Sequence, residues 1–194
     1  MKRFGSILIV FIILTFVLEF QTTAFAQGGR VKLSLRASVS QTLGADTEVK
    51  IVYSRPGVKG RIIWGELVPY GLYPGNQYSK NKPFPWRAGA DENTTIEFTN
   101  AVTINGKQLA AGKYSIHMIA SKTEWTVIFN TKNDGWGSYS YNQEEDALRI
   151  TVTPVKAPHQ EWLVFGFEEL AGTSATVFLH WEKLKIPFTI KLVE

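Results

Sequence analysis

The chain has 194 residues, of which 44% are hydrophobic and 20% are charged, and its formal net charge is +4. It contains no cysteine, which excludes disulfides, thiol catalysis and cysteine-ligated metals. Its basic residues are spread along the chain without runs, so no nucleic-acid partner is expected.

The N-terminal residues have the three parts of a signal peptide. Lys2 and Arg3 form a short basic start, and a largely apolar run follows over residues 7–18. Ala24-Phe25-Ala26 then supplies small residues at the positions that signal peptidase reads, which predicts cleavage after Ala26. The alternative is a permanent membrane anchor, but the run is shorter than the roughly 18 to 20 apolar residues that span a bilayer. We therefore expect a protein exported to the periplasm or the cell exterior, with no permanent membrane span after cleavage.

Beyond the signal peptide, side chains alternate between apolar and polar with a period of two. Residues 47–53, for example, place Val49 and Ile51 on one side, as in a strand with one dry face. Asn105-Gly106 predicts a tight type I′ hairpin turn. Further strands are predicted at 31–40, 94–102, 113–119, 125–130, 147–153, 161–167, 175–182 and 186–193. The pattern predicts an all-β fold, a two-layer antiparallel β-sandwich formed as a single domain by residues 27–194.

Residues 55–93 interrupt the alternation. Prolines and glycines recur there too often for a continuous strand. Its aromatic side chains carry more apolar area than a solvated linker needs: Trp64, Tyr70, Tyr73, Tyr78, Phe84 and Trp86. We expect this segment to pack over one end or face of the sandwich and to carry function.

Six short pieces in a fixed order give the chain a resemblance to a known family. They are 38–41 (SVSQ), 53–61 (YSRPGVKGR), 65–71 (GELVPYG), 86–90 (WRAGA) with Glu92 and Thr94, 111–115 (AGKYS), and 125–130 (WTVIFN). In this order they resemble the DUF2911 family of uncharacterised exported bacterial proteins, over about Ala37 to Phe167. The resemblance implies an envelope or secreted β-domain of undetermined activity, and it supplies no catalytic residue.

The chain departs from that resemblance at two places. In most members the tyrosine-glycine pair, here Tyr70-Gly71, stands a residue or two before the tryptophan-arginine pair, whereas residues 72–85 intervene in this chain. Members more often have an aromatic residue where this chain has His117. His117 is therefore not expected to be a functional group shared by the family.

The irregular segment and one later turn supply a candidate ligand-binding site. Its members are Arg55, Trp86, Arg87, Asp91, Glu92, Asn93 and Trp136. Paired guanidinium N–H donors suit a carboxylate, phosphate or sulfate, and a tryptophan face suits a sugar ring or planar group. Trp136, between two glycines, is expected to be exposed at the mouth of a pocket.

These residues also have a structural interpretation. Arg87 and Glu92 would pair across the loop, and Asn93-Thr94 would begin a strand through local side-chain hydrogen bonds. The glycine-rich stretch 55–61 is interpreted as a crossover, whose cations Arg55, Lys59 and Arg61 would also form a small anion-binding patch.

No metal and no cofactor is expected. His117, His159 and His180 are far apart in the sequence and match no metal-ligand spacing. The hypothesis we favour is a non-enzymatic, exported binding module for an envelope-associated small molecule, glycan or peptide. The alternatives are a glycan or ester hydrolase that uses Asp91 or Glu92 as acid or base, and a structural envelope component.

Overall fold

The computed structural model describes residues 32–193, so the predicted signal peptide lies outside the described residues. The strands are β1 (Leu35–Leu43), β2 (Thr47–Arg55), β3 (Thr95–Phe98), β4 (Val102–Ile104), β5 (Lys107–Leu109), β6 (Gly112–Ile119), β7 (Trp125–Asn130), β8 (Asp146–Val152), β9 (Val155–Glu168) and β10 (Ser174–Leu192). Two 3₁₀ turns, Gln77–Ser79 and Gln143–Glu145, complete the elements of this part of the chain, which has no α-helix. Nothing helical within residues 32–193 is long and apolar enough to cross a membrane.

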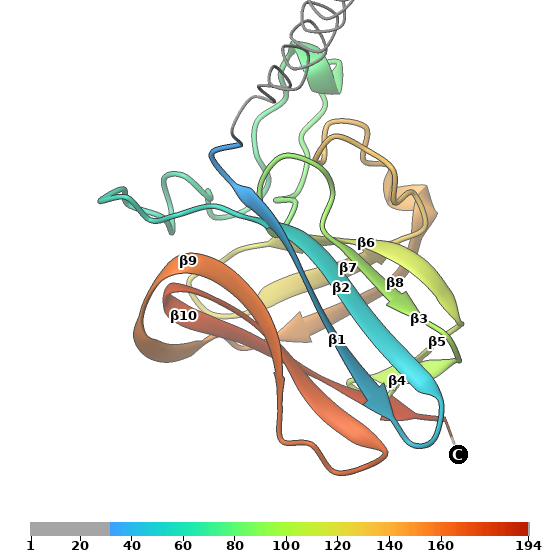
Figure 1. The fold of residues 1–194 in the computed structure, drawn as a ribbon. Helices are drawn as coiled ribbons and strands as arrows, with labels where there is room; N and C mark the ends of the chain where they lie inside the picture. The colour runs from blue at the N-terminus through green and yellow to red at the C-terminus, as the bar shows by residue number, and fades with distance from the viewer. Residues whose placement is uncertain (1–31, 194) are drawn as a thin grey trace, which may run out of the picture. The chain divides into compact units, whose positions relative to one another are not determined.

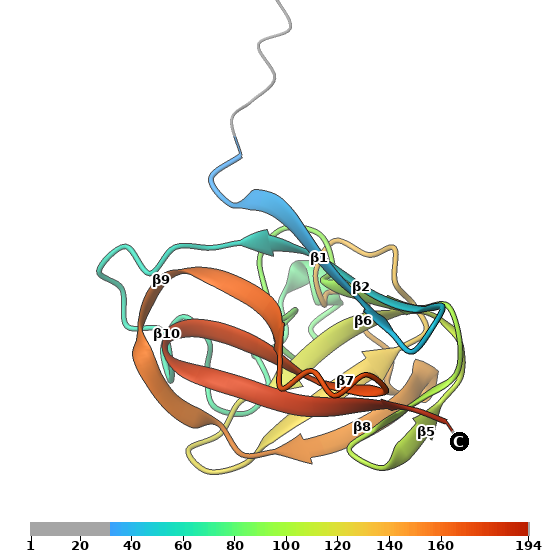
Figure 2. The same ribbon diagram turned by 60° about the horizontal axis from the view of Figure 1, so that its bottom comes forward.

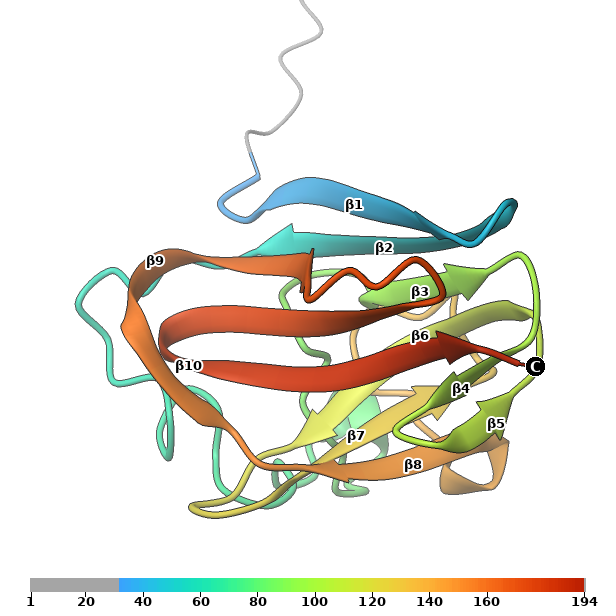
Figure 3. The same cartoon turned by 90° about the horizontal axis from the view of Figure 1, so that it is seen from below.

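The strands form two antiparallel sheets, which confirms the predicted all-β class and sandwich (Figure 1). The larger sheet has six strands in the order β1-β2-β3-β6-β7-β8, and the smaller has four in the order β5-β4-β10-β9 (Figure 3). In β2 the buried side chains Thr47, Val49, Ile51 and Tyr53 alternate with exposed or half-buried ones. This is the predicted arrangement of one face toward the core and one toward solvent.

The core lies between the two sheets. Val49 and Ile51 from β2 and Ile186 and Ile190 from β10 are fully buried. An edge-to-face contact at 5.7 Å between the rings of Phe129 on β7 and Phe188 on β10 crosses from one sheet to the other. Apolar side chains therefore join the two layers at this point. Their burial removes apolar area from water, and this stabilises the packing of one sheet on the other.

The hairpin predicted at Asn105-Gly106 is confirmed. It joins β4 to β5, with Ile104 paired to Lys107 across the turn. The φ angles of Asn105 and Gly106 are 47° and 79°, and a type I′ turn needs positive φ at both central residues. Asparagine and glycine tolerate this region better than other residues, which is why the dipeptide was informative.

The prediction of two separate strands at 175–182 and 186–193 was wrong, because these residues form the single strand β10. A bulge at Glu182 lies where the first predicted strand was expected to end. Pairing with β9 shifts register on both sides of Glu182, whose φ is 54°. A bulge bends a strand without ending it, so β9 and β10 form one long curved hairpin (Figure 2).

The prediction of one strand over 94–102 was also wrong. Its first part is β3 in the larger sheet, and its last residue begins β4 in the smaller sheet. The chain crosses between the sheets at Thr99 and Asn100, whose side chains bond the neighbouring hairpin: Glu48 N–H donates to Thr99 Oγ1 at 2.8 Å, and Asn100 Nδ2 donates to Thr47 Oγ1 at 3.1 Å. Side-chain partners at the crossing replace the ladder bonds that a continuous strand would make.

The irregular segment packs against the sandwich, as predicted. Residues 56–94 contain no strand, and their one regular element is the 3₁₀ turn at Gln77–Ser79. Val58, Ile63, Val68 and Trp86 of this segment belong to the hydrophobic core. The segment runs along the end of the sandwich that lies away from the end of β10 (Figure 3).

Candidate functional site

Backbone hydrogen bonds fasten the irregular segment to both sheets. Near its start, Val58 N–H donates to Glu161 O on β9 at 2.8 Å. Near its end, Trp86 and Met118 on β6 exchange N–H to carbonyl bonds at 2.9 and 2.8 Å. The segment is therefore bonded to the edge strand β9 of the smaller sheet at one point and to β6, inside the larger sheet, at another.

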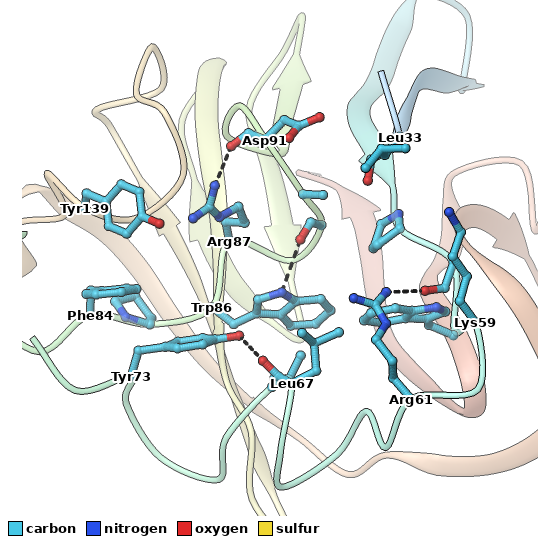
Figure 4. A pocket seen from close by; sticks show the side chains of 18 of the residues that line it. Leu33, Lys59, Arg61, Leu67, Tyr73, Phe84, Trp86, Arg87, Asp91 and Tyr139 are labelled. Atoms are coloured by element: carbon cyan, nitrogen blue, oxygen red, sulfur yellow. Dashed lines mark hydrogen bonds between the residues drawn. The ribbon is translucent and has the colours of Figure 1, made fainter. Parts of the chain in front are cut away.

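Residues from both attachments line a cavity of about 580 Å³ (Figure 4). Its aromatic side chains are Tyr73, Phe84, Trp86, Tyr139 and Trp181. Its cations are Lys59, Arg61 and Arg87. Among the carboxylates of residues 32–193, Asp91 is the one that lines it. A cavity of this size and mostly apolar character, with a few polar groups, is typical of small-molecule sites.

The aromatic residues are packed against one another, so the wall is rigid. The rings of Tyr73 and Phe84 are stacked, with centroids 5.3 Å apart and planes 5° from parallel. Phe84 meets Tyr139 edge to face at 5.2 Å. Trp86 and Trp181 are also stacked, with centroids 6.0 Å apart, and both are buried. Stacked and edge-to-face pairs of this kind stabilise beyond their buried area.

The hydroxyl of Tyr73 stays neutral at physiological pH. It donates to the carbonyl of Leu67 at 2.7 Å, and burial raises the pKa of Tyr73 to about 12. This bond ties two parts of the irregular segment together beside the cavity. Tyr73 therefore presents a ring to the cavity rather than a charge.

Arg87 is fixed in position by three neighbours. Its Nη1 donates to the carbonyl oxygen of Asp91 at 2.7 Å, and its guanidinium carbon lies 5.1 Å from the centre of the Tyr139 ring. It also packs on Gly137, where a Cβ would lie 2.1 Å from the guanidinium carbon. A guanidinium has five N–H donors, so most of those on Arg87 remain for a ligand.

The loop that carries Arg87 turns sharply. Ala88 and Asp91 have φ angles of 51° and 58°, in a region that residues other than glycine seldom adopt. The hydroxyl of buried Thr94 donates to Ala88 O at 3.0 Å, and Trp86 Nε1 donates to Gly89 O at 3.2 Å. These two bonds hold the strained backbone, and strain of this kind gathers at functional sites.

Lys59 and Arg61 lie on the opposite side of Trp86 from Arg87 (Figure 4). Arg61 donates to the carbonyl oxygens of Val58 at 3.1 Å and Gly57 at 2.5 Å. The ammonium of Lys59 lies 5.3 Å from the centre of the Trp162 ring. The backbone N–H of Lys59 bonds the Glu161 carboxylate at 2.9 Å and is the first cause of the lowered pKa of Glu161.

A second polar cluster lies behind the cavity, next to Gly137. His117 on β6 is buried, and its Nε2 lies 2.9 Å from Ser115 Oγ while its Nδ1 lies 2.7 Å from Ser138 Oγ. Burial lowers the pKa of His117 to about 4, so the ring is neutral at physiological pH. One nitrogen then donates and the other accepts, and the ring joins β6 to the loop that carries Tyr139.

Tyr141 and Asp146 extend this cluster. The Tyr141 hydroxyl donates to Asp146 Oδ2 at 2.7 Å, and Arg149 Nε donates to the same oxygen at 2.6 Å. Burial, followed by the bond to Asp146, raises the pKa of Tyr141 to about 12. The 131–145 loop is therefore bonded to the sheet through Ser138 and Tyr141, on both sides of Tyr139, whose ring contacts Arg87.

Comparison with protein families places this geometry in context. The chain matches the family described as "Protein of unknown function (DUF2911)" over residues 34–190. The match includes every strand apart from the last two residues of β10, and every residue that lines the cavity apart from Leu33. The chain belongs to the DUF2911 family. Comparison with curated proteins gave no match, and neither did comparison with solved structures.

The DUF2911 domain brings together some of the residues predicted for the site. Trp86, Arg87 and Asp91 line the cavity. Arg55 does not line it, because Arg55 Nε donates to Leu163 O on β9 at 2.9 Å. Arg55 therefore joins the end of β2 in the larger sheet to β9 in the smaller sheet.

The other three predicted residues lie outside the cavity lining. Glu92 is half-buried beside Asp91. Asn93 N–H donates to Gly135 O at 3.0 Å, which joins the Arg87 loop to the loop of Tyr139. Trp136 is 57% exposed, as its position between glycines predicted.

Several lining residues of the DUF2911 domain had no signal of their own in the sequence. Tyr139 lies in a loop without a motif, and Trp181 is a core residue of β10 whose ring also lines the cavity. Lys59 and Arg61 were predicted as an anion-binding patch but not joined to Trp86 and Arg87. Within residues 32–193, no three histidine, aspartate or glutamate side chains cluster closely enough to hold a metal ion.

Gly137→Ala is expected to displace Arg87 at a modest cost in stability. The new Cβ would lie 2.1 Å from the guanidinium carbon, and φ at this position is 65°. The flexible side chain is the group that moves, so we expect loss of the Arg87 bond to Asp91 and a destabilisation of about 1 to 2 kcal/mol from the positive φ. Gly172→Ala is the matched control, because φ is 73° and nothing lies within 4 Å of its Cβ. Urea denaturation of both variants, with a crystal structure of Gly137→Ala, checks this; an unmoved Arg87 contradicts it.

Proposed function

We propose that this DUF2911 domain is an exported binding module whose cavity takes a small-molecule ligand. The observation that carries the proposal is the cavity of about 580 Å³ in which aromatic faces and three cationic side chains converge from loops fixed on both sheets. Loops held by a rigid scaffold are where binding residues are most often found. The wall is already packed, so little order has to be gained on binding.

The geometry favours binding over the hydrolase alternative. Acid and base chemistry on a glycosidic bond needs two carboxyl groups about 5 to 10 Å apart in one site. Asp91 lines the cavity, whereas Glu92 does not, so the cavity lining holds one carboxyl group among the described residues. Turnover of a glycan or ester by the purified protein, lost in Asp91→Asn, would favour the hydrolase instead.

Export is part of the proposal. It is supported by the basic start, the apolar run at 7–18 and the Ala24-Phe25-Ala26 sequence. We expect the mature chain to begin at Gln27 and to act in the periplasm or outside the cell. The intact mass of the protein recovered from the periplasm or medium after expression of the full chain checks the cleavage position.

A ligand screen tests the binding function. We expect a thermal-shift screen of small metabolites, followed by calorimetry, to give hits whose affinity falls about ten-fold in Tyr139→Ala. Tyr139 is half-buried and its ring lines the cavity. Tyr70→Ala is the control, because Tyr70 is 43% exposed and does not line the cavity. Hits that bind both variants as tightly as the native protein would contradict the proposal.

A further inference from the structure

We infer that the ligand of this cavity is an amphipathic anion, with a flat apolar body and at least one carboxylate, sulfate or phosphate group. This inference rests on the proposed binding function and names the class of ligand. It follows from the charges in the cavity, from what those charges already contact, and from the composition of the wall between them.

The cavity carries an excess of positive charge. Lys59, Arg61 and Arg87 line it, against the single carboxylate of Asp91 among the described residues. Within residues 32–193 neither arginine forms an ion pair: Arg87 donates to a backbone carbonyl, and Arg61 donates to two. Lys59 lies near the Glu161 carboxylate, whereas the two arginines have no carboxylate partner among these residues. Such arginines favour an anionic ligand, because its acidic group supplies the missing counter-charge.

Of the two guanidinium groups, that of Arg87 is the more firmly held in position for binding an anion. It is half-buried and held by Asp91 O, the Tyr139 ring and the backbone at Gly137. A side chain already fixed in this way loses little conformational freedom when it binds. Its remaining N–H donors suit the paired oxygens of a carboxylate, sulfate or phosphate.

The surface between the cationic groups is apolar. Trp86 lies between Arg87 and Arg61 in Figure 4, with Tyr73 and Leu67 below it and Phe84 to its left. The indole N–H of Trp86 bonds Gly89 O, so the small exposed part of this buried ring adds an apolar surface and no free donor to the wall. A ligand whose flat apolar part lies on this surface can place its acidic group next to the guanidinium of Arg87 or of Arg61.

A neutral glycan fits this wall less well. Sugar hydroxyls need donors and acceptors around an aromatic platform, and the amide in the lining belongs to Asn76. The side-chain oxygen of Asn76 already accepts from the backbone N–H groups of Tyr78 and Ser79. The other uncharged polar side chains of the lining are Ser34, Tyr73 and Tyr139, and the Tyr73 hydroxyl already donates to Leu67 O, so few such groups are left to pair with hydroxyls.

Two fluorescent probes with the same body test this inference. 8-Anilinonaphthalene-1-sulfonate carries a sulfonate, and N-phenyl-1-naphthylamine is the uncharged counterpart. We expect the native protein to bind the sulfonate at least about ten-fold more tightly. Arg87→Gln is expected to weaken sulfonate binding about ten-fold and to leave the uncharged probe within about two-fold.

Control variants separate charge from folding. Arg36→Gln removes an exposed cation on β1 that does not line the cavity, and both affinities should remain unchanged. Gly137→Ala keeps the charge of Arg87 but displaces it, so sulfonate binding should weaken there and not in Gly172→Ala. This second pair keeps the test decisive if Arg87→Gln folds poorly.

Two outcomes would overturn the inference in different ways. Equal affinity for both probes, each weakened by Tyr139→Ala, rejects the anionic class and leaves the binding function in place. Affinities for both probes that no cavity variant changes, together with a ligand screen without hits, reject the class and the binding function together.

Discussion

Lowering the pH from 7 to 5 is expected to reduce the free energy of unfolding by about 2 kcal/mol through His117 alone, and by about 3 kcal/mol at pH 4. Burial lowers the pKa of His117 from 6.5 to about 4, whereas the imidazole of the unfolded chain keeps its ordinary pKa. Between these values the unfolded chain binds a proton that the folded protein does not, so acid favours unfolding. The stabilisation is complete above about pH 6.5 and is lost as the pH falls toward 4.

The groups around His117 act on its pKa in opposite directions. Burial is the largest cause, the Asp146 carboxylate opposes it, and the Arg87 guanidinium adds to it. The Tyr141 ring lies 5.2 Å away, and Lys132 lines the same small space. A protonated ring would also need both serine hydroxyls to accept hydrogen bonds, which the neutral ring does not require.

Urea denaturation at pH 7, 6 and 5 measures this dependence before most carboxylates titrate. His117→Gln removes the titrating group and should have a smaller fall in stability over this range than the native protein. His159→Gln, which replaces a more exposed histidine, should keep the native fall. An equal fall in His117→Gln and the native protein would show that other groups cause it.

The part of the fold that could be predicted is the part set by local alternation. β2 buries every second residue from Thr47 to Tyr53. The same alternation can be seen in the sequence as a period of two in side-chain polarity. The errors occurred where a contact with another strand decides the outcome. Glu182 lies in a bulge because β9 pairs with β10 on both sides of it. The sequence of residues 182–185 does not by itself distinguish a bulge from a turn.

The candidate site divides in the same way. Trp86, Arg87 and Asp91 are close in sequence, so a local reading could group them, and all three line the cavity. Tyr139 and Trp181 reach it from distant parts of the chain through the packing of the two sheets. Arg55 lies apart from them, because at the end of β2 its guanidinium bonds the backbone of β9.

Trp64→Ala is expected to destabilise the protein by about 3 kcal/mol, because Trp64 joins the irregular segment to the core. Its ring makes edge-to-face contacts with Trp125 at 5.0 Å, Trp181 at 5.7 Å and Trp86 at 5.9 Å. Removing it leaves a void beneath the two tryptophans that line the cavity. Equilibrium denaturation in urea measures the loss, and ligand binding should weaken in parallel because Trp86 and Trp181 lose a supporting neighbour.

Trp64→Phe separates the role of the ring from that of the indole N–H. Within residues 32–193 that buried N–H has no hydrogen-bond partner, and an unpaired buried donor costs about 1 to 3 kcal/mol. Phenylalanine removes the donor and keeps an aromatic face, so the gain offsets most of the lost burial and the net change should be within about 1 kcal/mol. Trp136→Ala, at a site 57% exposed, is the control and should also change stability by about 1 kcal/mol or less. A Trp64→Phe variant as unstable as Trp64→Ala would contradict this. It would mean that the indole N–H has a hydrogen-bond partner in solution, and that this bond rather than ring packing stabilises the cluster.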